Sequence, residues 1–235
     1  MSTASPSHLL LGRRFMVIYR RLLRRYGPQH WWPGDGAFET ILGAILTQNT
    51  SWKNVEGALA SLKAAGALRP DRLRALPQEG LARLIRSSGF FNVKARRLKA
   101  FAQYLGDRHG DDLDAFLRQD PAALRNELLG VHGIGPETAD DILLYAAGAP
   151  FFVIDAYTKR ILRRLGVAPA GDDYGTFQAL FHDNLKQDVA LFNEYHALLD
   201  RHAKEACRKQ PLCQRCCLLD LCPTGKSGTG ASGGG

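Results

Sequence analysis

All five cysteines of the chain fall between Cys207 and Cys222. Four of them follow the spacing Cys207-x5-Cys213-x2-Cys216-x5-Cys222, and Cys217 lies directly beside the third. A disulfide framework spreads its cysteines along a small secreted chain, so this concentration indicates a metal centre instead. Four thiolates at such spacing can bind a tetrahedral zinc ion or a cubane iron–sulfur cluster, and the spacing alone does not distinguish the two.

The segment VHGIGPETAD is the second feature with chemical potential. A helix is predicted to end near Leu129, and Pro136 and Glu137 suit the first turn of the next helix. Gly133 and Gly135 allow the backbone to approach an anion closely, and the free N–H groups at a helix start bind phosphate without reading sequence. The pattern predicts a helix–hairpin–helix unit, although an ordinary turn between helices also needs glycine.

Asp155 is the third feature, and it directly precedes the helical pattern AYTKRILRRL. It suits the N-cap of that helix, where a side-chain oxygen accepts hydrogen bonds from the first N–H groups. The positive end of the helix dipole also favours a carboxylate at this position. Its position leaves two interpretations open, a cap alone and a cap that also does chemistry.

The elements that must position these residues are predicted to be helical. Apolar residues recur at helical spacing over 9–26, 38–46, 52–64, 77–87, 95–105, 113–117 and 121–129. Residues 26–36 contain two Pro and three Gly and are predicted to form a loop. Strand patterns are nearly absent, and so are repeats of about 20 to 50 residues, so we predict a compact all-α fold. Residues 223–235 offer no apolar surface to bury and are predicted to be a flexible tail.

Composition limits the class of protein. The 235 residues are 45% hydrophobic, which is enough for one large domain or two small ones. The net charge of +8 and the pI near 9.4 favour a polyanionic partner such as nucleic acid. The longest apolar stretch, residues 142–154, is shorter than the roughly 20 residues that span a bilayer, and no secretion signal is apparent. We therefore expect a cytoplasmic monomer without a membrane partner, nucleoid-associated if the source is bacterial.

Residues 128–155 resemble the signature of the endonuclease III superfamily of DNA glycosylases, in which a helix–hairpin–helix, a Gly/Pro-rich loop and an Asp occur in this order. The resemblance covers about residues 35–222 and implies a two-lobed all-α HhH-GPD fold. One lobe is a six-helix barrel domain over 37–149, and the other is an iron–sulfur cluster domain formed by 1–36 and 150–222. By this resemblance Asp155 is the catalytic carboxylate, and the partner is double-stranded DNA containing damaged bases, lying across the cleft. The implied hairpin contacts to DNA are His132, Gly133, Gly135 and Thr138.

The cysteine spacing resembles the iron–sulfur loop of endonuclease III and of the related adenine glycosylase. This resemblance implies a 4Fe-4S cluster, and its expected ligands are Cys207, Cys213, Cys216 and Cys222. Those relatives usually have six residues between the first two cysteines, whereas this chain has five. Cys217 stays open as an alternative third ligand.

A glycosylase that acts on duplex DNA must flip a base out and fill the vacated stack. The segment LTQNT resembles the family segment whose Gln fills this space, which implies that role for Gln48. The segment GFFNVKA resembles the one that carries a wedge on the opposite strand, which implies Phe90, although an aromatic residue there also suits the core. Lys94 is a candidate phosphate contact or a member of a solvated helix face.

Two further residue patterns indicate the reaction and the substrate. Bifunctional relatives have a Lys before the hairpin Thr, but here Glu137 precedes Thr138, and a carboxylate cannot form an imine. We therefore predict monofunctional base release, with AP lyase activity weak or absent. The pattern GIGPETAD together with WWP resembles the 3-methyladenine branch, which itself lacks the iron–sulfur loop. That resemblance assigns the base pocket to Trp31, Trp32 and Trp52, whose rings suit a positively charged alkylpurine.

Together these features predict a base excision repair glycosylase, a hydrolase that removes alkylated purines. Asp155 would stabilise an oxocarbenium-like sugar and orient or deprotonate water. One alternative is an endonuclease III-like glycosylase, with or without lyase activity, for oxidised pyrimidines, uracil or mismatched thymine. The others are a non-catalytic damage-sensing DNA-binding protein and a zinc-stapled RNA-binding protein.

Overall fold

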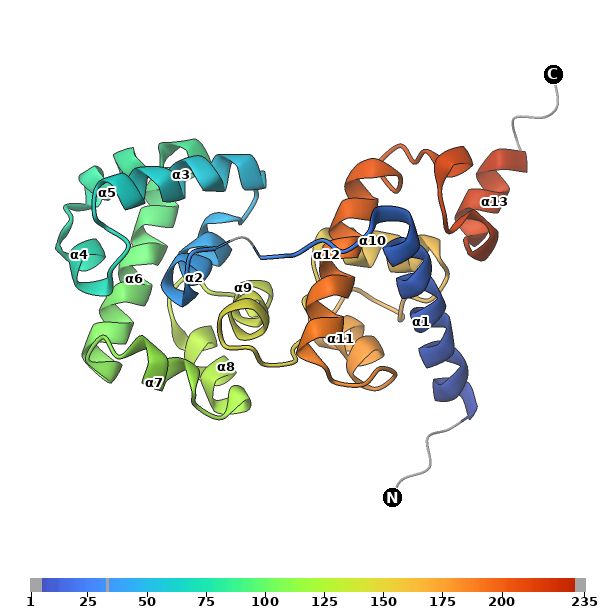
Figure 1. The fold of residues 1–235 in the computed structure, drawn as a ribbon, viewed down its shortest axis with the longest axis horizontal. Helices are drawn as coiled ribbons and strands as arrows, with labels where there is room; N and C mark the ends of the chain where they lie inside the picture. Colours follow the sequence, from blue (N-terminus) through green and yellow to red (C-terminus); the bar gives the residue numbers. More distant parts are fainter. Residues whose placement is uncertain (1–5, 33, 231–235) are drawn as a thin grey trace. The chain divides into compact units, whose positions relative to one another are not determined.

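The computed structural model describes residues 6–32 and 34–230, and every regular element within these ranges is helical (Figure 1). The predicted all-α class is therefore confirmed. The chain forms two compact units, one of Met1–Trp31 with Pro150–Gly235 and one of Trp32–Ala149. None of the helices in the described ranges is long and apolar enough to cross a membrane.

The unit of residues 32–149 is built around one almost completely buried helix. Its helices are α2 (Ala37–Leu46), α3 (Trp52–Ala64), α4 (Pro70–Ala75), α5 (Gln78–Leu84), α6 (Phe91–His109), α7 (Leu113–Leu117), α8 (Pro121–Gly130) and α9 (Pro136–Asp141), with a 3₁₀ turn η1 (Arg86–Ser88) and a π-helical turn η2 (Ile142–Ala146). All residues of α2 except Ala37 and Glu39 are buried. Because it is buried on almost all sides, α2 forms the core against which α3, α6, α9 and η2 pack.

The long helix α6 packs against α4, α5 and α7 (Figure 1). Its buried side includes Leu98, Phe101 and Leu105 at helical spacing. The backbone that leads into it is left-handed at Gly89 (φ 67°) and at Phe90 (φ 44°). A non-glycine residue rarely adopts this conformation, so the surrounding structure must maintain the turn.

Helices α8 and α9 form the predicted helix–hairpin–helix. The side chain of Asp120 accepts hydrogen bonds from the N–H groups of Ala122 and Ala123 and so begins α8. The hairpin is joined by Arg125 of α8, whose Nε lies 2.6 Å from Oδ1 of Asp140 on α9. Because the Asp140 side chain is completely buried, this ion pair fixes the two helices of the hairpin to each other.

The second unit contains α1 (Pro6–Tyr26), α10 (Ala156–Arg164), α11 (Tyr174–His182), α12 (Val189–Glu205), the short 3₁₀ turns η3 (Cys213–Arg215) and η4 (Leu219–Leu221), and α13 (Pro223–Gly230). Its core is a stack of aromatic rings. The Phe152 and Phe181 rings are 3.6 Å apart and nearly parallel, and Phe15 of α1 stacks on Phe181 at 4.9 Å. Tyr195 of α12 donates a hydrogen bond to the carbonyl of Phe15, so α1 and α12 are joined across this core.

The structure differs from the predicted flexible tail at residues 223–235, because 223–230 form α13. Pro223 has a fixed φ that suits the first helical position. The backbone carbonyl of Cys222 accepts from the N–H of Lys226 at 3.1 Å, and its Sγ accepts from the N–H of Gly225 at 3.3 Å. Cys222 therefore caps a helix whose sequence offers little apolar surface, and 231–235 lie outside the described residues.

We expect Arg125→Leu to lower the free energy of unfolding by about 3 kcal/mol, because it removes the guanidinium partner of the buried Asp140 carboxylate. Lys63→Met is the matched control, since it breaks an exposed ion pair with Asp35 and should leave stability unchanged. Chemical denaturation of both variants measures the difference. Equal midpoints for the two variants would show that the buried pair does not fix the hairpin.

Candidate functional site

Asp155 is the N-cap residue of α10, as predicted. Its Oδ1 accepts a hydrogen bond of 2.6 Å from the N–H of Thr158. Its Oδ2 lies 3.9 Å from Nε2 of His196 on α12, which is too long for a hydrogen bond. The Asp155 side chain is 18% exposed, so solvent reaches it. One oxygen is thus used by the cap, and this contact leaves the other oxygen available for a second role.

The hairpin turn before α9 requires glycine at one position. Gly133 has a φ of 87°, and a Cβ there would collide with the side chain of Arg97. Gly135 is different, because its backbone is extended and a Cβ would meet nothing within 4 Å. His132 and Glu137 are exposed around the turn. The exposed hairpin residues are therefore accessible to a ligand.

The side chains of Gln48 and Thr138 are hydrogen-bonded to each other and do not point outward separately. The Gln48 amide Nε2 donates to Oγ1 of Thr138 at 2.9 Å and to the carbonyl of Gly133 at 3.2 Å. The Thr138 side chain is 4% exposed. This corrects the predicted DNA contact for the Thr138 side chain, because its hydroxyl is buried under Gln48. Gln48 itself lies against the hairpin in this structure.

Phe90 is 70% exposed, so the alternative that it belongs to the core is wrong. The residue lies at the N-terminus of α6 in the left-handed conformation, where Gly89 precedes it. Left-handed backbone at a residue other than glycine persists only where the surrounding structure maintains it, and such residues cluster at functional sites. Its assignment as a wedge stays a prediction.

Lys94 is not a surface residue. Its side chain is 1% exposed, and Nζ donates to the carbonyl oxygens of Leu46 at 2.8 Å and Ser88 at 2.6 Å. Burial, together with the charge of Arg97, lowers the pKa of Lys94 to about 8. Both predicted roles, a phosphate contact and a solvated helix face, are therefore corrected, because the ammonium is bonded to two backbone carbonyls inside the unit.

Three aromatic side chains gather beside α2. The Trp32 ring is 4.9 Å from Trp52 in an edge-to-face arrangement and 5.0 Å from Tyr145. Gly43 makes room for them, since a Cβ on it would lie 3.2 Å from the Trp32 ring. Nε1 of Trp52 donates to the carboxylate of Glu56 at 2.9 Å. Predicted pocket residues Trp32 and Trp52 are thus brought together, whereas Trp31 belongs to the other unit.

Tyr145 is a member of this aromatic group that the sequence does not indicate. It lies on the π-helical turn η2 that continues α9. Such turns are rare and occur often at functional sites, but the sequence ILLYAAG carries no signal for one. The backbone widening became visible only in the structure.

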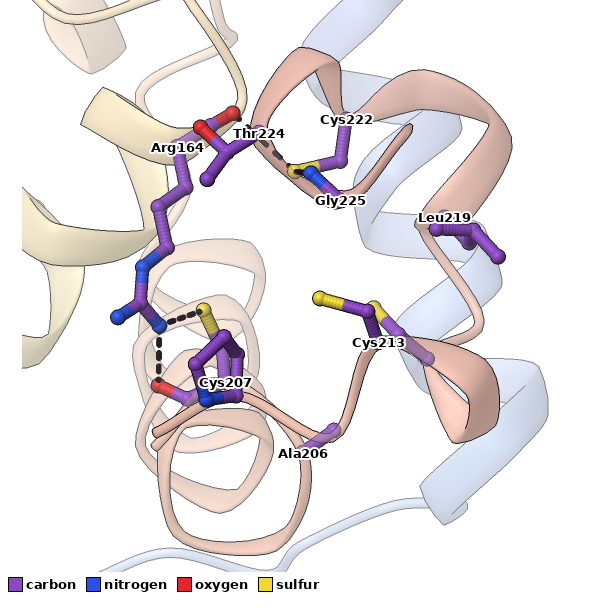
Figure 2. Close-up of a pocket in the computed structure, with 10 residues that line it drawn as sticks. Arg164, Ala206, Cys207, Cys213, Leu219, Cys222, Thr224 and Gly225 are labelled. Carbon is purple, nitrogen blue, oxygen red and sulfur yellow. Dashed lines mark hydrogen bonds between the residues drawn. The ribbon is translucent and has the colours of Figure 1, made fainter. Parts of the chain in front are cut away.

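The four predicted cysteine ligands surround one pocket (Figure 2). Cys207, Cys213, Cys216 and Cys222 line it, and Cys217 does not. The pocket is partly open to solvent. In the described part of the chain, no group of three or more His, Cys, Asp or Glu side chains converges on a position for a single metal ion.

Several N–H groups point at the sulfur atoms, which suits thiolates. Arg164 donates to Sγ of Cys207 at 3.2 Å, as Figure 2 shows, and the N–H of Leu218 donates to Sγ of Cys216 at 3.4 Å. Burial raises the pKa of Cys216 to about 11, and the neighbouring thiols add to this effect. Cysteine binds a metal as the thiolate, so four cysteine side chains around one pocket with N–H groups directed at their sulfur atoms fit a metal centre.

Comparison with known proteins places the chain among DNA repair proteins. Residues 42–187 match the family model for the HhH-GPD superfamily of base excision DNA repair proteins. A protein of Methanocaldococcus jannaschii named as a DNA repair glycosylase is 44% identical over 206 residues, which cover 87% of this chain and 94% of that protein.

Many solved structures are similar to this one, including the following two. The 3-methyladenine DNA glycosylase of H. pylori, solved with 1,N6-ethenoadenine, is 27% identical with a TM-score of 0.68, covering 84% of this chain and 97% of that one. An endonuclease III trapped covalently on DNA is 22% identical with a TM-score of 0.81, covering 93% and 98%. The second likeness shows the shared fold.

We expect Cys216→Ser to lose most of the bound metal, because the Cys216 thiol lines the pocket, and Cys217→Ser to retain it, because the adjacent thiol does not. Metal analysis of the two purified variants, counting iron and zinc per chain, makes the comparison. Retention by Cys216→Ser with loss by Cys217→Ser would assign the third ligand to Cys217.

Proposed function

The chain belongs to the HhH-GPD superfamily of base excision DNA repair proteins, and we propose that it is a monofunctional glycosylase releasing alkylated purines from double-stranded DNA. Its family makes it a DNA repair glycosylase. The proposal concerns the substrate and the fate of the strand. It depends mainly on one observation, the group of aromatic rings formed by Trp32, Trp52 and Tyr145.

These aromatic rings suit a cationic purine. An alkylated purine such as 3-methyladenine carries positive charge on its ring, and cation–π attraction favours it over a neutral base by about 0.5 to 2 kcal/mol. The carboxylate of Glu56, which accepts a hydrogen bond from Nε1 of Trp52, adds negative charge beside one of these rings. The likeness to the H. pylori 3-methyladenine glycosylase supports the same substrate class. We assign the flipped base to these rings.

Asp155 would carry the hydrolysis. When the N-glycosidic bond breaks, the cationic base departs with the bonding electrons as a neutral purine, so it needs little acid catalysis. The Asp155 carboxylate would stabilise the positive charge that develops on the sugar. Its Oδ2, which the cap does not use, would then accept the proton of the water that adds to the sugar carbon. The products are a free base and an abasic site in an intact strand.

The lysines near these positions do not offer a nucleophile for strand cleavage. The residue before Thr138 is Glu137, which cannot form a Schiff base. Lys94 is buried and bonded to two carbonyls. Lys159 donates to the carbonyl of Asp172 at 2.7 Å and pairs with its carboxylate. These observations support hydrolysis without lyase chemistry.

We further propose that Cys207, Cys213, Cys216 and Cys222 bind a 4Fe-4S cluster. Thiolates distributed around a pocket suit a cubane, because each binds a different iron atom. The cluster would supply structure and no step of the reaction. The helical turns η3 and η4 in this segment have three residues each, too few to be stable alone, so the bound group would order them.

The protein should release a methylpurine from a methylated duplex, and the strand should break only after alkali treatment. Asp155→Asn should reduce release by about 100-fold or more, because the neutral amide cannot accept the water proton. Its melting temperature should change little, since Asn is an equally good N-cap.

Other outcomes of this assay identify the alternatives. Release of thymine glycol or uracil in preference to methylpurine would favour an endonuclease III-like substrate. Nicking without alkali would show that an amine of this chain forms a Schiff base. Absence of release from every duplex, with tight binding to them, would indicate a damage sensor.

Trp52→Leu should lower the preference for 3-methyladenine over the neutral 1,N6-ethenoadenine by roughly 2- to 30-fold, the range expected for one lost cation–π contact. Glu56→Gln is the companion variant, and a smaller change in the same direction is expected because it removes charge but no ring. Single-turnover excision rates on the two substrates measure the preference. An equal loss of excision rate on both substrates would show that Trp52 contributes to the shape of the base site and not to recognition of the positive charge.

A further inference from the structure

The buried lysine of α6 connects two segments that are distant in sequence. Nζ of Lys94 donates to the carbonyl of Leu46, the last residue of α2, and to the carbonyl of Ser88, the last residue of η1. Carbonyl groups at helix ends lack partners within the helix, and they carry the negative end of the helix dipole. A single ammonium group can donate hydrogen bonds to both of these carbonyls at once.

Each of these carbonyls lies two residues before a side chain that we assign to DNA. Gln48 follows Leu46, and Phe90 follows Ser88. Both short segments contain left-handed backbone, at Asn49 (φ 55°) in the first and at Phe90 in the second. Such conformations persist only where the surrounding structure maintains them. Nζ of Lys94 donates a hydrogen bond to the backbone carbonyl of the residue that begins each of these two segments.

We propose that Lys94 is a positioning residue that holds Gln48 and Phe90 at a fixed separation, so that both enter the duplex together when the base leaves the stack. The proposal rests on the proposed function, because it takes Gln48 as the plug and Phe90 as the wedge. All of these residues belong to the unit of residues 32–149.

The hydrogen bonds to the two carbonyls, and not the filling of space, account for an ammonium group in this position. Burying an ammonium is costly, and a methionine of similar length would fill the same space without that cost. Burial lowers the pKa of Lys94 only to about 8, so the group still carries its charge at neutral pH. The charge is therefore retained for the two carbonyls that it bonds.

Lys99 provides a matched control on the same helix. Its Nζ donates to the carbonyl of Leu76 at 2.6 Å, between α4 and α5, where no residue is assigned to DNA. Lys94→Met removes an ammonium that binds two backbone carbonyls, and Lys99→Met removes one that binds a single backbone carbonyl. The two variants differ in the segment that loses its hydrogen bond. Lys94→Met affects the segments that lead to Gln48 and Phe90, and Lys99→Met affects the segment between α4 and α5.

The test compares base release from a methylated duplex with release from the same single strand. A base in a single strand leaves no stack to fill, so it does not need the plug and wedge. Lys94→Met should lose on the order of tenfold or more in kcat/KM on the duplex and remain within about twofold on the single strand. Lys99→Met should show no such selectivity. Equal losses on both substrates for Lys94→Met would overturn the proposal.

A double-mutant cycle on the duplex alone gives an independent test. If Lys94 acts through the wedge, Lys94→Met should cause a much smaller loss in a Phe90→Ala background than in the wild type. A loss from Lys94→Met that is as large in the Phe90→Ala background as in the wild type would contradict the proposal. Lys94→Gln, which keeps a polar donor, replaces Lys94→Met in both measurements if thermal unfolding shows that the methionine variant does not fold. An inactive wild type contradicts the proposed function, whereas an active wild type with unselective variants contradicts only the role of Lys94.

Discussion

Every α-helix leaves N–H groups unbonded at its start and carbonyl groups unbonded at its end, and an all-helical protein must satisfy them at each terminus. In this chain several of the groups that do so are also ones to which we assign function. Asp155 satisfies an N–H group at the start of α10, and Lys94 binds the last carbonyl of α2. The Gly133 carbonyl between α8 and α9 accepts from Gln48. Hydrogen bonds at helix ends therefore hold in place the side chains to which we assign function.

This arrangement explains how a helical scaffold presents polar groups with little cost in stability. A carboxylate that caps a helix is held by the backbone and needs no additional framework, so one of its oxygens remains for a reaction. At the C-terminus Cys222 has a similar double role, because it lines the cysteine pocket and its carbonyl and Sγ accept from the first turn of α13. Binding of a metal group there would therefore also stabilise α13.

Features that depend only on neighbouring residues along the chain could be predicted from the sequence. Helical periodicity predicts α3 over 52–64 as observed, and the N-cap role of Asp155 follows from its place before a helical pattern. Features that depend on distant partners were missed. The burial of Lys94 depends on Leu46, 48 residues away, and a basic residue is usually exposed. The placement of Thr138 under Gln48 and of Tyr145 beside Trp32 likewise depends on contacts between separate segments.

The central claim is that this glycosylase releases a base by hydrolysis and forms no covalent bond to DNA. The most direct test is borohydride reduction during the reaction with a methylated duplex, since borohydride traps a Schiff base between an amine and the sugar. The account predicts release of methylpurine with no protein–DNA adduct visible on a denaturing gel. An adduct that forms in step with base release would contradict it and assign catalysis to an amine of this chain.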